Sequence, residues 1–396
     1  MYDAIIVGAR CAGSPVAMLL ARRGHRVLVV DRATFPSDTI STHVLLPPAV
    51  SCLQRWGLDG EIEKHGAPAI DLVTLDAGPF VLTGAPAPAD GNNLLSCCRR
   101  TILDRILVEA ADAAGAEVRQ GFTVTGLVEQ EGVVTGVRGH DRLGREVTER
   151  ARIVLGADGL HSRVAELVGA SRSIDRGTLT CCYYSYFSGV DMQTTLAPRD
   201  GAAVGAVPTN DGMFIAMAWR RAGEAHRFRA DPEGTFWATM DLAPEVAERL
   251  RGGRREERFH GTADLPNFFR TSHGPGWALL GDAACHKDPI TAMGITDAFR
   301  DAEEVADAVD RGLGDGAIDE HLRDYAKRRD QKLMPMFDFT VQMAGLEPPP
   351  PDLAAVLEAL QDQPEHTSRF LGVLAATVPV TEFMAPENLE RILTRT

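Results

Sequence analysis

Carboxylates at the ends of apolar runs are the side chains in this sequence that are best placed to do chemistry. Asp31 ends the run Val27–Val30 and lies eighteen residues after Gly13. At this spacing a carboxylate accepts hydrogen bonds from the ribose of an adenine dinucleotide. Asp158 and Asp282 also follow apolar runs, and each adjoins a glycine. Asp31 therefore predicts that the segment before it binds a nucleotide.

That segment has the order strand, glycine turn, helix, strand. We expect Ala4–Val7 to be a strand buried on both faces, Ser14–Arg23 to be a helix that Gly24 ends, and Val27–Val30 to be the second strand. A helix that begins directly after such a turn offers free N–H groups and a positive dipole to a pyrophosphate. A parallel strand–helix–strand unit without any ligand is the alternative.

The turn, residues 8–13, departs from the dinucleotide-binding pattern at one position. Gly8 permits a tight turn, and Gly13 lets the helix lie close to the strand. The middle glycine, which normally admits the phosphates, is replaced by Arg10. This arginine either neutralises the phosphates or shifts the loop slightly.

Two further strand–turn units follow along the chain. The first, residues 152–159, ends in an Asp-Gly pair and leads to a helix for which Ser162 is the expected N-cap. The second, residues 277–284, contains a Gly-Asp pair and leads to a helix over residues 296–309. Acidic residues near the start of that helix suit its dipole.

The ordered set of glycine turn, Asp-Gly pair and Gly-Asp pair resembles the single-component FAD-dependent monooxygenases with the p-hydroxybenzoate hydroxylase fold. The resemblance covers roughly residues 1–335, and Arg100–Leu107 adds a fourth match. It implies an enzyme that binds FAD, takes electrons from NADH or NADPH, and reacts with O2 through a C4a-hydroperoxyflavin. One oxygen atom then hydroxylates or epoxidises a small organic substrate, such as an aromatic compound or a secondary metabolite. In such an enzyme the cofactor supplies the oxidising chemistry, and the protein orients the substrate and excludes water.

The resemblance also implies which residues bind FAD. The glycine turn and Asp31 are expected at the ADP half, Val124 beside the adenine, and Arg100 and Asp282 near the ribitol and pyrophosphate. The helix that starts at Gly294 would point its positive end at the flavin and stabilise the anion formed on reduction. The complete expected set is Gly8, Cys11, Ala12, Gly13, Asp31, Arg32, Arg100, Val124, Asp158, Gly281, Asp282, Pro289, Gly294 and Ile295.

Three residues are the expected catalytic group: Pro289 beside the isoalloxazine, and His43 and His286 as candidates for the base that deprotonates a phenolic substrate. Both histidines have purely structural alternatives, and His286 would then pin its loop. For Asp158 the alternative is a capping or turn role, because aspartate favours turns. His161 is expected to take part in the local hydrogen bonding of the Asp-Gly turn.

Three other functions stay open. An FAD-dependent reductase or dehydrogenase of the geranylgeranyl-reductase-like type would work without oxygen insertion, although its aromatic Trp-Phe-Pro motif is not evident. Flavin-dependent halogenases share the Asp-Pro pair before Gly294, but they carry a Trp-x-Trp-x-Ile-Pro motif and a reactive lysine. Here the candidate strand, residues 214–219, lacks that motif, and no lysine lies between Lys64 and Lys287. A flavoprotein that only binds or regulates is the third alternative.

The expected fold class is α/β: a three-layer, Rossmann-like FAD-binding domain with a parallel sheet, interrupted by an antiparallel-sheet substrate domain. We assign residues 1–70, 95–172 and 266–335 to the FAD-binding domain, 71–94 and 173–265 to the substrate domain, and 336–396 to a helical C-terminal segment. The residues expected to bind substrate are Tyr184, Tyr186, Met217, Trp219 and Phe383. For each of them, packing in the core is the alternative.

Composition narrows the remaining possibilities. The 396 residues are 44% apolar, which is typical of a globular protein, and 41 basic against 55 acidic residues give a net charge of −14. This excess argues against general nucleic-acid binding. No apolar run reaches the length of a membrane span, and the N-terminus has no basic export signal, so we expect a cytoplasmic protein. The seven cysteines are expected to be reduced thiols, no cluster has metal-ligand spacing, and a monomer or a homodimer is expected.

Overall fold

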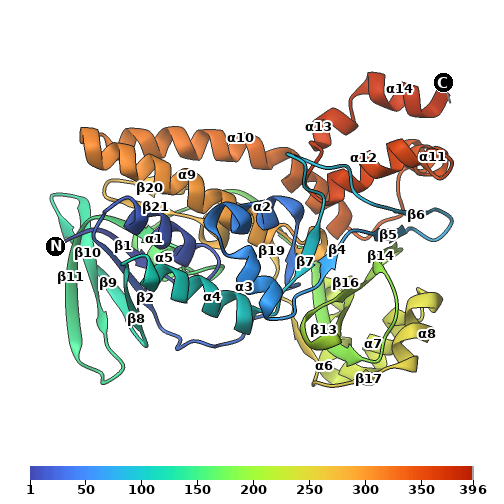
Figure 1. Ribbon diagram of the computed structural model, residues 1–396, viewed down its shortest axis with the longest axis horizontal. Coiled ribbons are helices and arrows are strands. Elements are labelled where there is room, and N and C mark those ends of the chain that lie inside the picture. Colours follow the sequence, from blue (N-terminus) through green and yellow to red (C-terminus); the bar gives the residue numbers. More distant parts are fainter. Residues whose placement is uncertain (395–396) are drawn as a thin grey trace.

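Two eight-stranded sheets, one mainly parallel and one mainly antiparallel, organise the computed structural model, which describes residues 1–394 (Figure 1). The last two residues of the segment expected over 336–396 lie outside the described residues. Helices cover the sheets, and in Figure 1 the long helices α9 (Gly294–Asp315) and α10 (Ile318–Ala344) run side by side along one edge of the molecule.

The first sheet is assembled from segments that lie far apart in the sequence. In spatial order its strands are β20 (His273–Gly274), β21 (Trp277–Leu279), β11 (Glu146–Gly156), β1 (Tyr2–Val7), β2 (Val27–Asp31) and β8 (Glu117–Gln120). The strands from β21 to β8 are parallel to one another, and β20 is antiparallel to β21. The strands β9 (Thr123–Gln130) and β10 (Val133–His140) extend from β11 in antiparallel order. The central strand β1 is apolar from Ala4 to Val7 because both of its faces are covered there: Ala4 and Ile6 face one hydrophobic cluster, and Ile5 and Val7 face another.

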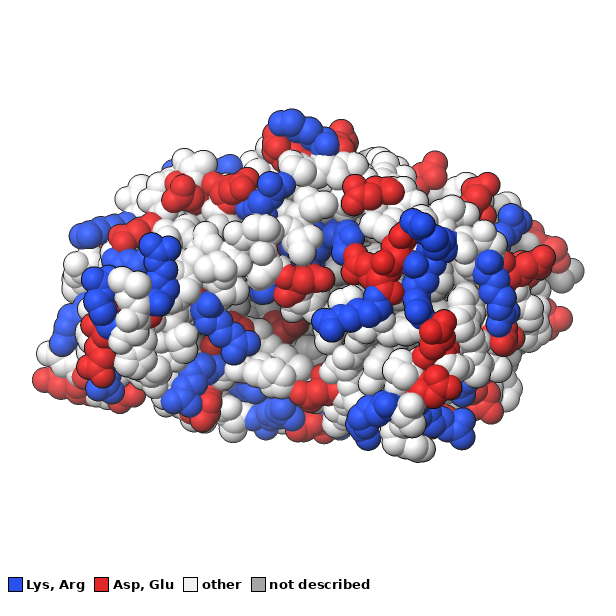
Figure 2. All heavy atoms as spheres, turned by 90° about the horizontal axis from the view of Figure 1, so that it is seen from below, with Lys and Arg blue, Asp and Glu red and all other residues white. Residues whose placement is uncertain are grey.

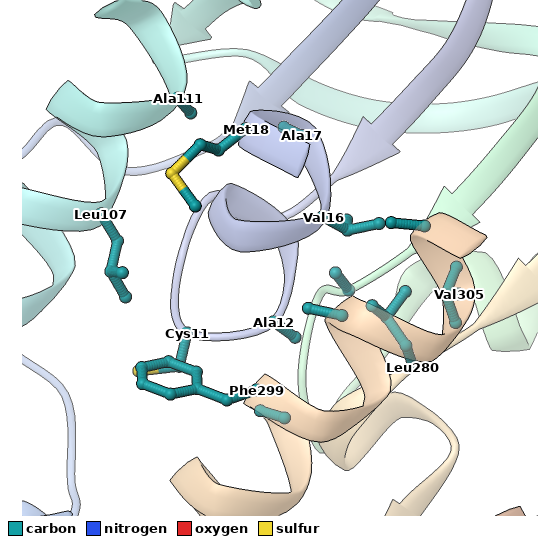
Figure 3. Packing of buried hydrophobic residues seen from close by; sticks show 14 of the residues in the cluster. Cys11, Ala12, Val16, Ala17, Met18, Leu107, Ala111, Leu280, Phe299 and Val305 are labelled. Carbon is teal, nitrogen blue, oxygen red and sulfur yellow. The ribbon is translucent and has the colours of Figure 1, made fainter. Parts of the chain in front are cut away.

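Helix α1 (Gly13–Arg22) lies between two other helices on one face of this sheet. Figure 3 shows Met18 directed at Ala111 of α4 (Arg100–Ala113), while Val16 lies on the side of Val305 in α9. The opposite face is covered by β9, β10 and the short helix α5 (Arg163–Leu167). This arrangement forms the three layers that the sequence predicted.

The second sheet separates two hydrophobic layers. Its order is β17 (Arg254–Arg255), β13 (Thr180–Ser188), β16 (Phe214–Arg221), β15 (Ala202–Pro208), β14 (Thr194–Arg199), β5 (Val73–Asp76) and β6 (Val81–Gly84), with β18 (His260–Thr262) also paired to β13. One face packs on α6 (Ala225–Ala230), α7 (Pro232–Met240) and α8 (Pro244–Gly252). The sheet was expected to be antiparallel, but β14 and β5 are parallel because the β5–β6 hairpin joins from a distant segment of the chain.

The described residues also form two three-stranded sheets. The strands β12 (Arg172–Thr178), β19 (Pro266–Arg270) and β22 (Cys285–His286) form one of them, and β3 (Val44–Leu45), β7 (Leu95–Cys97) and β4 (Ala69–Ile70) form the other, beside α2 (Pro47–Trp56) and α3 (Asp59–Lys64). Residues 172–178, which lie at the start of the expected substrate segment 173–265, pair with β19 and not with the second sheet.

The C-terminal segment is helical, as predicted, and covers the other face of the second sheet. It contains α11 (Pro351–Leu360), α12 (Pro364–Leu374), α13 (Val380–Phe383) and α14 (Pro386–Thr394). Helix α10 runs across the expected boundary at residue 335, through Pro335 to Ala344. Within the described residues, no helix is long and apolar enough to cross a membrane.

Charged side chains of both signs are interspersed on the surface. On the face in Figure 2, blue and red groups alternate across the molecule. Several form close pairs, such as Arg251 with Asp241 at 2.6 Å and Arg119 with Glu149 at 2.5 Å. The excess negative charge is therefore not gathered into one patch on this face.

Replacement of Gly13 by alanine tests the backbone packing around α1. A Cβ atom at Gly13 would lie 1.7 Å from the carbonyl oxygen of Gly8, so strand and turn must separate. We expect Gly13→Ala to lower the free energy of unfolding in urea by at least about 2 kcal/mol. In the control Gly60→Ala, the new Cβ meets nothing within 4 Å, and the change should be neutral or stabilising. Equal stability of the two variants would contradict this reasoning.

Candidate active site

The three glycine-containing turns meet at one place, backbone against backbone. Gly8 has φ 102°, and a Cβ there would lie 2.4 Å from the carbonyl oxygen of Ala157, at the end of β11. A Cβ at Gly281 would lie 3.0 Å from the Cβ of Ala12, at the start of α1. Glycine is needed at these positions because a side chain would push the turns apart. The motifs that lie between Gly8 and Asp282 in the sequence are thus adjacent in space.

Asp31 holds the first turn closed. Its Oδ2 accepts a hydrogen bond from the backbone N–H of Ala9 at 2.7 Å, and its Oδ1 accepts one from Ala33 at 2.7 Å. Its carbonyl oxygen accepts a hydrogen bond from Phe122, which places Val124 of β9 near the end of β2. Arg32, by contrast, is exposed.

A buried carboxylate that sequence reasoning missed joins the first turn to α4. Asp104 is completely buried and contacts Arg10 at 2.6 Å and Arg100 at 3.0 Å, and it accepts a hydrogen bond from the thiol of Cys11 at 3.3 Å. Burial alone would lower the pKa of Arg100, but the charge of Asp104 raises it above its ordinary value. Arg10 is therefore held by Asp104 and by the hydroxyl of Ser37 at 2.7 Å. The sequence did contain a signal: Asp104 follows Arg100 by four positions, the spacing of a helical ion pair.

The Asp-Gly motif has the capping role that was the alternative for Asp158. The Asp158 carboxylate accepts hydrogen bonds from the hydroxyl of Ser162 at 2.5 Å and from the backbone N–H of Arg163 at 2.6 Å. Ser162 caps α5 as predicted, accepting from Ala165. Burial raises the pKa of Asp158. His161 was expected to join this turn, but it is exposed and lies 3.3 Å from Asp264 instead.

A second missed carboxylate, Asp301, fixes the Gly-Asp motif to α9. Its Oδ2 accepts the backbone N–H of Gly281 at 2.9 Å, and burial raises its pKa to about 6. This contact places Asp282 at the start of α9, where its Oδ1 lies 4.0 Å from the position of a Cβ on Gly294. Asp282 also acts electrostatically on Arg100. The expected cofactor residues Arg100, Asp282 and Gly294 are therefore brought together.

Buried hydrogen bonds shape the loop between the Gly-Asp motif and α9. His286 bonds through Nδ1 to the carbonyl oxygen of Pro266, so it pins the loop to β19, which was its structural alternative. Asp288 accepts hydrogen bonds from the hydroxyl of Thr180 at 2.5 Å and from the backbone N–H of Ile290 at 3.0 Å. Burial raises the pKa of Asp288 to about 6. The loop thus presents Pro289 at a fixed position.

An apolar cavity of about 110 Å³ lies between this loop, the second sheet and α12. Pro289 to Ala292 form one wall, and Met217 and Trp219 of β16 form part of the wall opposite. Among the described residues that line the cavity, none is charged. An uncharged, mainly apolar lining of this kind suits a small organic ligand.

Tyr184 and Tyr186 lie beside this cavity rather than in its wall. They are cross-strand neighbours of Met217 and Ile215, so they share the face of Met217, but they pack against His43. The Nε2 of His43 lies 2.5 Å from the Tyr186 hydroxyl. Burial, together with nearby arginines, lowers the pKa of His43 to about 3.

The low pKa of His43 does not suit a base that removes a proton from a phenol, because the imidazole is neutral and resists protonation. Burial also raises the pKa of Tyr186 well above its ordinary value. The pair is therefore a neutral hydrogen-bonded contact. Phe383, the remaining expected substrate residue, is completely buried against Phe370 and does not line the cavity.

FAD fits the residues that converge here. The close contacts at Gly8, Gly13 and Gly281 bring the first turn and the starts of α1 and α9 together. In the described part of the chain no side chain caps α1 or α9, so the backbone N–H of Gly13 in α1 and those of the first turn of α9 stay available to phosphate and flavin oxygens. By contrast, Ser162 occupies the corresponding position of α5.

Comparison with known proteins agrees with this geometry. Residues 1–340 match the family model described as "FAD binding domain". A digeranylgeranylglycerophospholipid reductase of Methanosarcina acetivorans is 25% identical over 83% of this chain and 80% of its own length. A rifampicin monooxygenase of Streptomyces venezuelae is 25% identical over 94% of this chain and 77% of its own length.

Two solved structures show the same fold. A myxobacterial chondrochloren halogenase superposes with a TM-score of 0.80 at 22% identity, covering 99% of this chain and 97% of its own. A probable FAD-dependent monooxygenase from Pseudomonas aeruginosa gives a TM-score of 0.72 at 23% identity, covering 94% and 99%.

The fold is therefore the α/β fold of the single-component FAD-dependent monooxygenases, as predicted. The chain belongs to the FAD-binding family that the model describes, and it is an FAD-dependent oxidoreductase. Its relatives include monooxygenases, halogenases and geranylgeranyl reductases.

Removal of the charge of Asp104 should destabilise the cofactor side of the protein. In Asp104→Asn the buried guanidinium of Arg100 loses its counter-charge, and we expect the free energy of unfolding to fall by about 3 kcal/mol. Retention of FAD in equilibrium dialysis should also weaken. The control Asp175→Asn breaks an exposed pair with Arg172 and should cost less than about 1 kcal/mol. Similar losses in both variants would contradict a special role for Asp104.

The raised pKa of Asp288 predicts a pH-dependent stability. The native state holds the proton up to about pH 6, whereas the unfolded chain releases it near 3.8, so this contribution is complete below pH 3.8 and is lost as the pH rises through 6. Relative to Asp288→Asn, the wild type should lose about 2 kcal/mol between pH 4 and pH 7. Urea unfolding at several pH values measures this difference, and the titration of Asp301 cancels because both proteins contain it. A constant difference would show that the native pKa is not raised.

Proposed function

We propose that this protein is a monooxygenase that uses FAD, NADH or NADPH, and O2 to add one oxygen atom to a small organic substrate. The observation that carries the proposal is the apolar cavity whose wall is Pro289 to Ala292, the loop that leads directly into the uncapped start of α9. A substrate in this cavity would lie next to a flavin held at that helix start. When bound, FAD supplies the redox and oxygen chemistry.

The residues of the chain position the substrate and keep water away from it. Met217 and Trp219 supply an apolar wall, and the C-terminal helices close the cavity from the other side through residues such as Leu371. Exclusion of water protects reactive oxygen species from unproductive loss. We propose that Arg100, Asp282 and the turn at Gly8 hold the cofactor through its phosphates, ribitol and adenosine.

The neutral contact between His43 and Tyr186 has a positioning role in this proposal. It joins the loop before β3 to β13, so it fixes the second sheet relative to the cofactor side. His286 performs the same task for the loop at Pro289. We further propose that the first sheet with its helices is the cofactor domain, that the second sheet is the substrate domain, and that the protein acts in the cytoplasm as a monomer or homodimer.

A reductase is the second candidate. The relatives include a digeranylgeranylglycerophospholipid reductase, and an uncharged cavity also suits a reaction that saturates an apolar substrate without oxygen insertion. The two functions differ in the fate of oxygen and in the mass of the product.

A screen under 18O2 distinguishes them. The FAD-loaded protein is mixed with NADH or NADPH and a panel of apolar compounds, and the consumption of nicotinamide is measured together with product mass. A monooxygenase should yield a product that is heavier by one 18O atom. A product that gains two hydrogens, equally well under argon, would establish the reductase and overturn the proposal. A sample without substrate serves as the control for uncoupled oxidation.

A further inference from the structure

A second cavity, of about 560 Å³, lies between α2, α9, α10 and residues 376–381. In Figure 1 this is the region where α2, α9 and α10 approach α13. The cavity adjoins the first one: Ala292 lines the first and Met293 the second, and likewise Ala375 lines the first and Ala376 the second. Its volume is in the range of small-molecule sites, and the proposed reaction does not account for it.

The wall of the second cavity is part apolar and part charged, whereas that of the first is uncharged. Met293, Met336 and Val378 supply apolar surface. The charged side chains of the wall are three cations and three acids: Arg55, Arg300, Lys332, Asp90, Glu303 and Glu304. A molecule in this cavity would therefore meet a hydrophobic surface and ionic groups at the same time.

Two of the three acids are already paired with the other two cations. Glu303 accepts hydrogen bonds from Arg55 at 2.7 and 3.1 Å and from the Nε1 of Trp56 at 3.1 Å, so both of its oxygens are engaged. Glu304 pairs with Lys332 at 3.2 Å. These contacts leave neither acid to neutralise the remaining cation, although both lie within one helical turn of it on α9.

That cation, Arg300, has no acidic partner within residues 1–394. Its guanidinium carries five N–H donors, and in the described chain it makes one long hydrogen bond, to the carbonyl oxygen of Ala376 at 3.4 Å. Arg300 is half-buried, whereas Asp90, the third acid, is exposed, so water screens its charge. Arg300 follows Met293 by seven positions, or two helical turns, and thus lies on the same face of α9.

From these observations we propose that the second cavity is a binding site for an organic anion. The carboxylate or phosphate of the ligand pairs with Arg300, and its apolar part packs on Met293, Met336 and Val378. Two sources have this chemistry in an oxidoreductase: an acidic substrate before it enters the first cavity, and a nicotinamide dinucleotide. The choice of these two sources rests on the proposed function, but the site itself does not.

Four small molecules test the site by equilibrium dialysis against the FAD-loaded protein. We expect octanoate to bind about fivefold more tightly than octanol, the effect of a half-buried charged hydrogen bond. Protonated octylamine should bind more weakly than octanol because its charge repels that of Arg300. Acetate should bind at least about tenfold more weakly than octanoate, since it buries little apolar surface. Octanoate that binds no more tightly than octanol or octylamine would overturn the anion site, and acetate that binds as tightly as octanoate would overturn its apolar part.

The variant Arg300→Gln removes the charge and keeps an amide N–H for the carbonyl oxygen of Ala376. It should reduce the affinity for octanoate to that for octanol, whereas Arg300→Lys should restore part of the difference. The matched control is Arg311→Gln, which removes an exposed arginine from the same helix, outside the cavity wall, and should preserve the preference. A preference that survives in Arg300→Gln would refute the role of Arg300. Because the wild-type affinities alone can refute the anion site, a variant that fails to fold does not remove the test.

Oxidised NADP+, which transfers no hydride, distinguishes the two sources. If NADP+ displaces octanoate from the wild type and itself binds more weakly to Arg300→Gln, the ligand of the site is the nicotinamide dinucleotide. If NADP+ and octanoate bind together, the ligand is an acidic substrate. Either result supports the site.

These affinities require neither reduction of the flavin nor oxygen transfer. A failure of the 18O2 experiment would therefore overturn the proposed reaction and leave the anion site standing. Conversely, equal binding of octanoate and octanol would overturn the site even if a labelled product were found.

Discussion

The close backbone contact between three turns is the constraint on which the rest of this structure depends. Gly8 packs against the end of β11, Gly13 packs against Gly8, and Gly281 packs against the start of α1. Only residues without a Cβ permit these approaches. As a result, α1 and α9 begin next to each other without side-chain caps, and the free N–H groups at Gly13 and in the first turn of α9 suit an anionic dinucleotide.

Three buried acidic residues fix the positions of these turns and of the loop before α9. Asp104 binds the arginines of the first turn and of α4, Asp301 binds the backbone of the Gly-Asp motif, and Asp288 shapes the loop after it. A buried carboxylate is tolerated only when it is neutralised or hydrogen-bonded, so each of these acids needs its partners in a fixed geometry. The pKa values of Asp288 and Asp301 rise to about 6 because hydrogen bonds only partly offset their burial.

The two faces of the second sheet have different roles. Side chains such as Phe187 and Ala216 face α6 to α8 and provide stability, whereas Met217 and Trp219 face the cavity. This division follows from the alternation of side chains along a strand. In the proposed function, the uncharged cavity wall limits which substrates can bind, and the cofactor supplies the chemistry of the reaction.

The sequence by itself determined the strand–turn–helix units, the α/β class and the family, because these follow from local periodicity and from glycines at fixed spacing. It also placed Met217 and Trp219 on a common face. Only the tertiary structure decided which polar groups meet: Asp104 with Arg10, Asp301 with Gly281, and His43 with Tyr186. Such partners are separated by up to 143 residues, and no local pattern records their approach. For the same reason the lowered pKa of His43 could not be predicted from the sequence, because the side chain is buried near arginines only when the layers pack together.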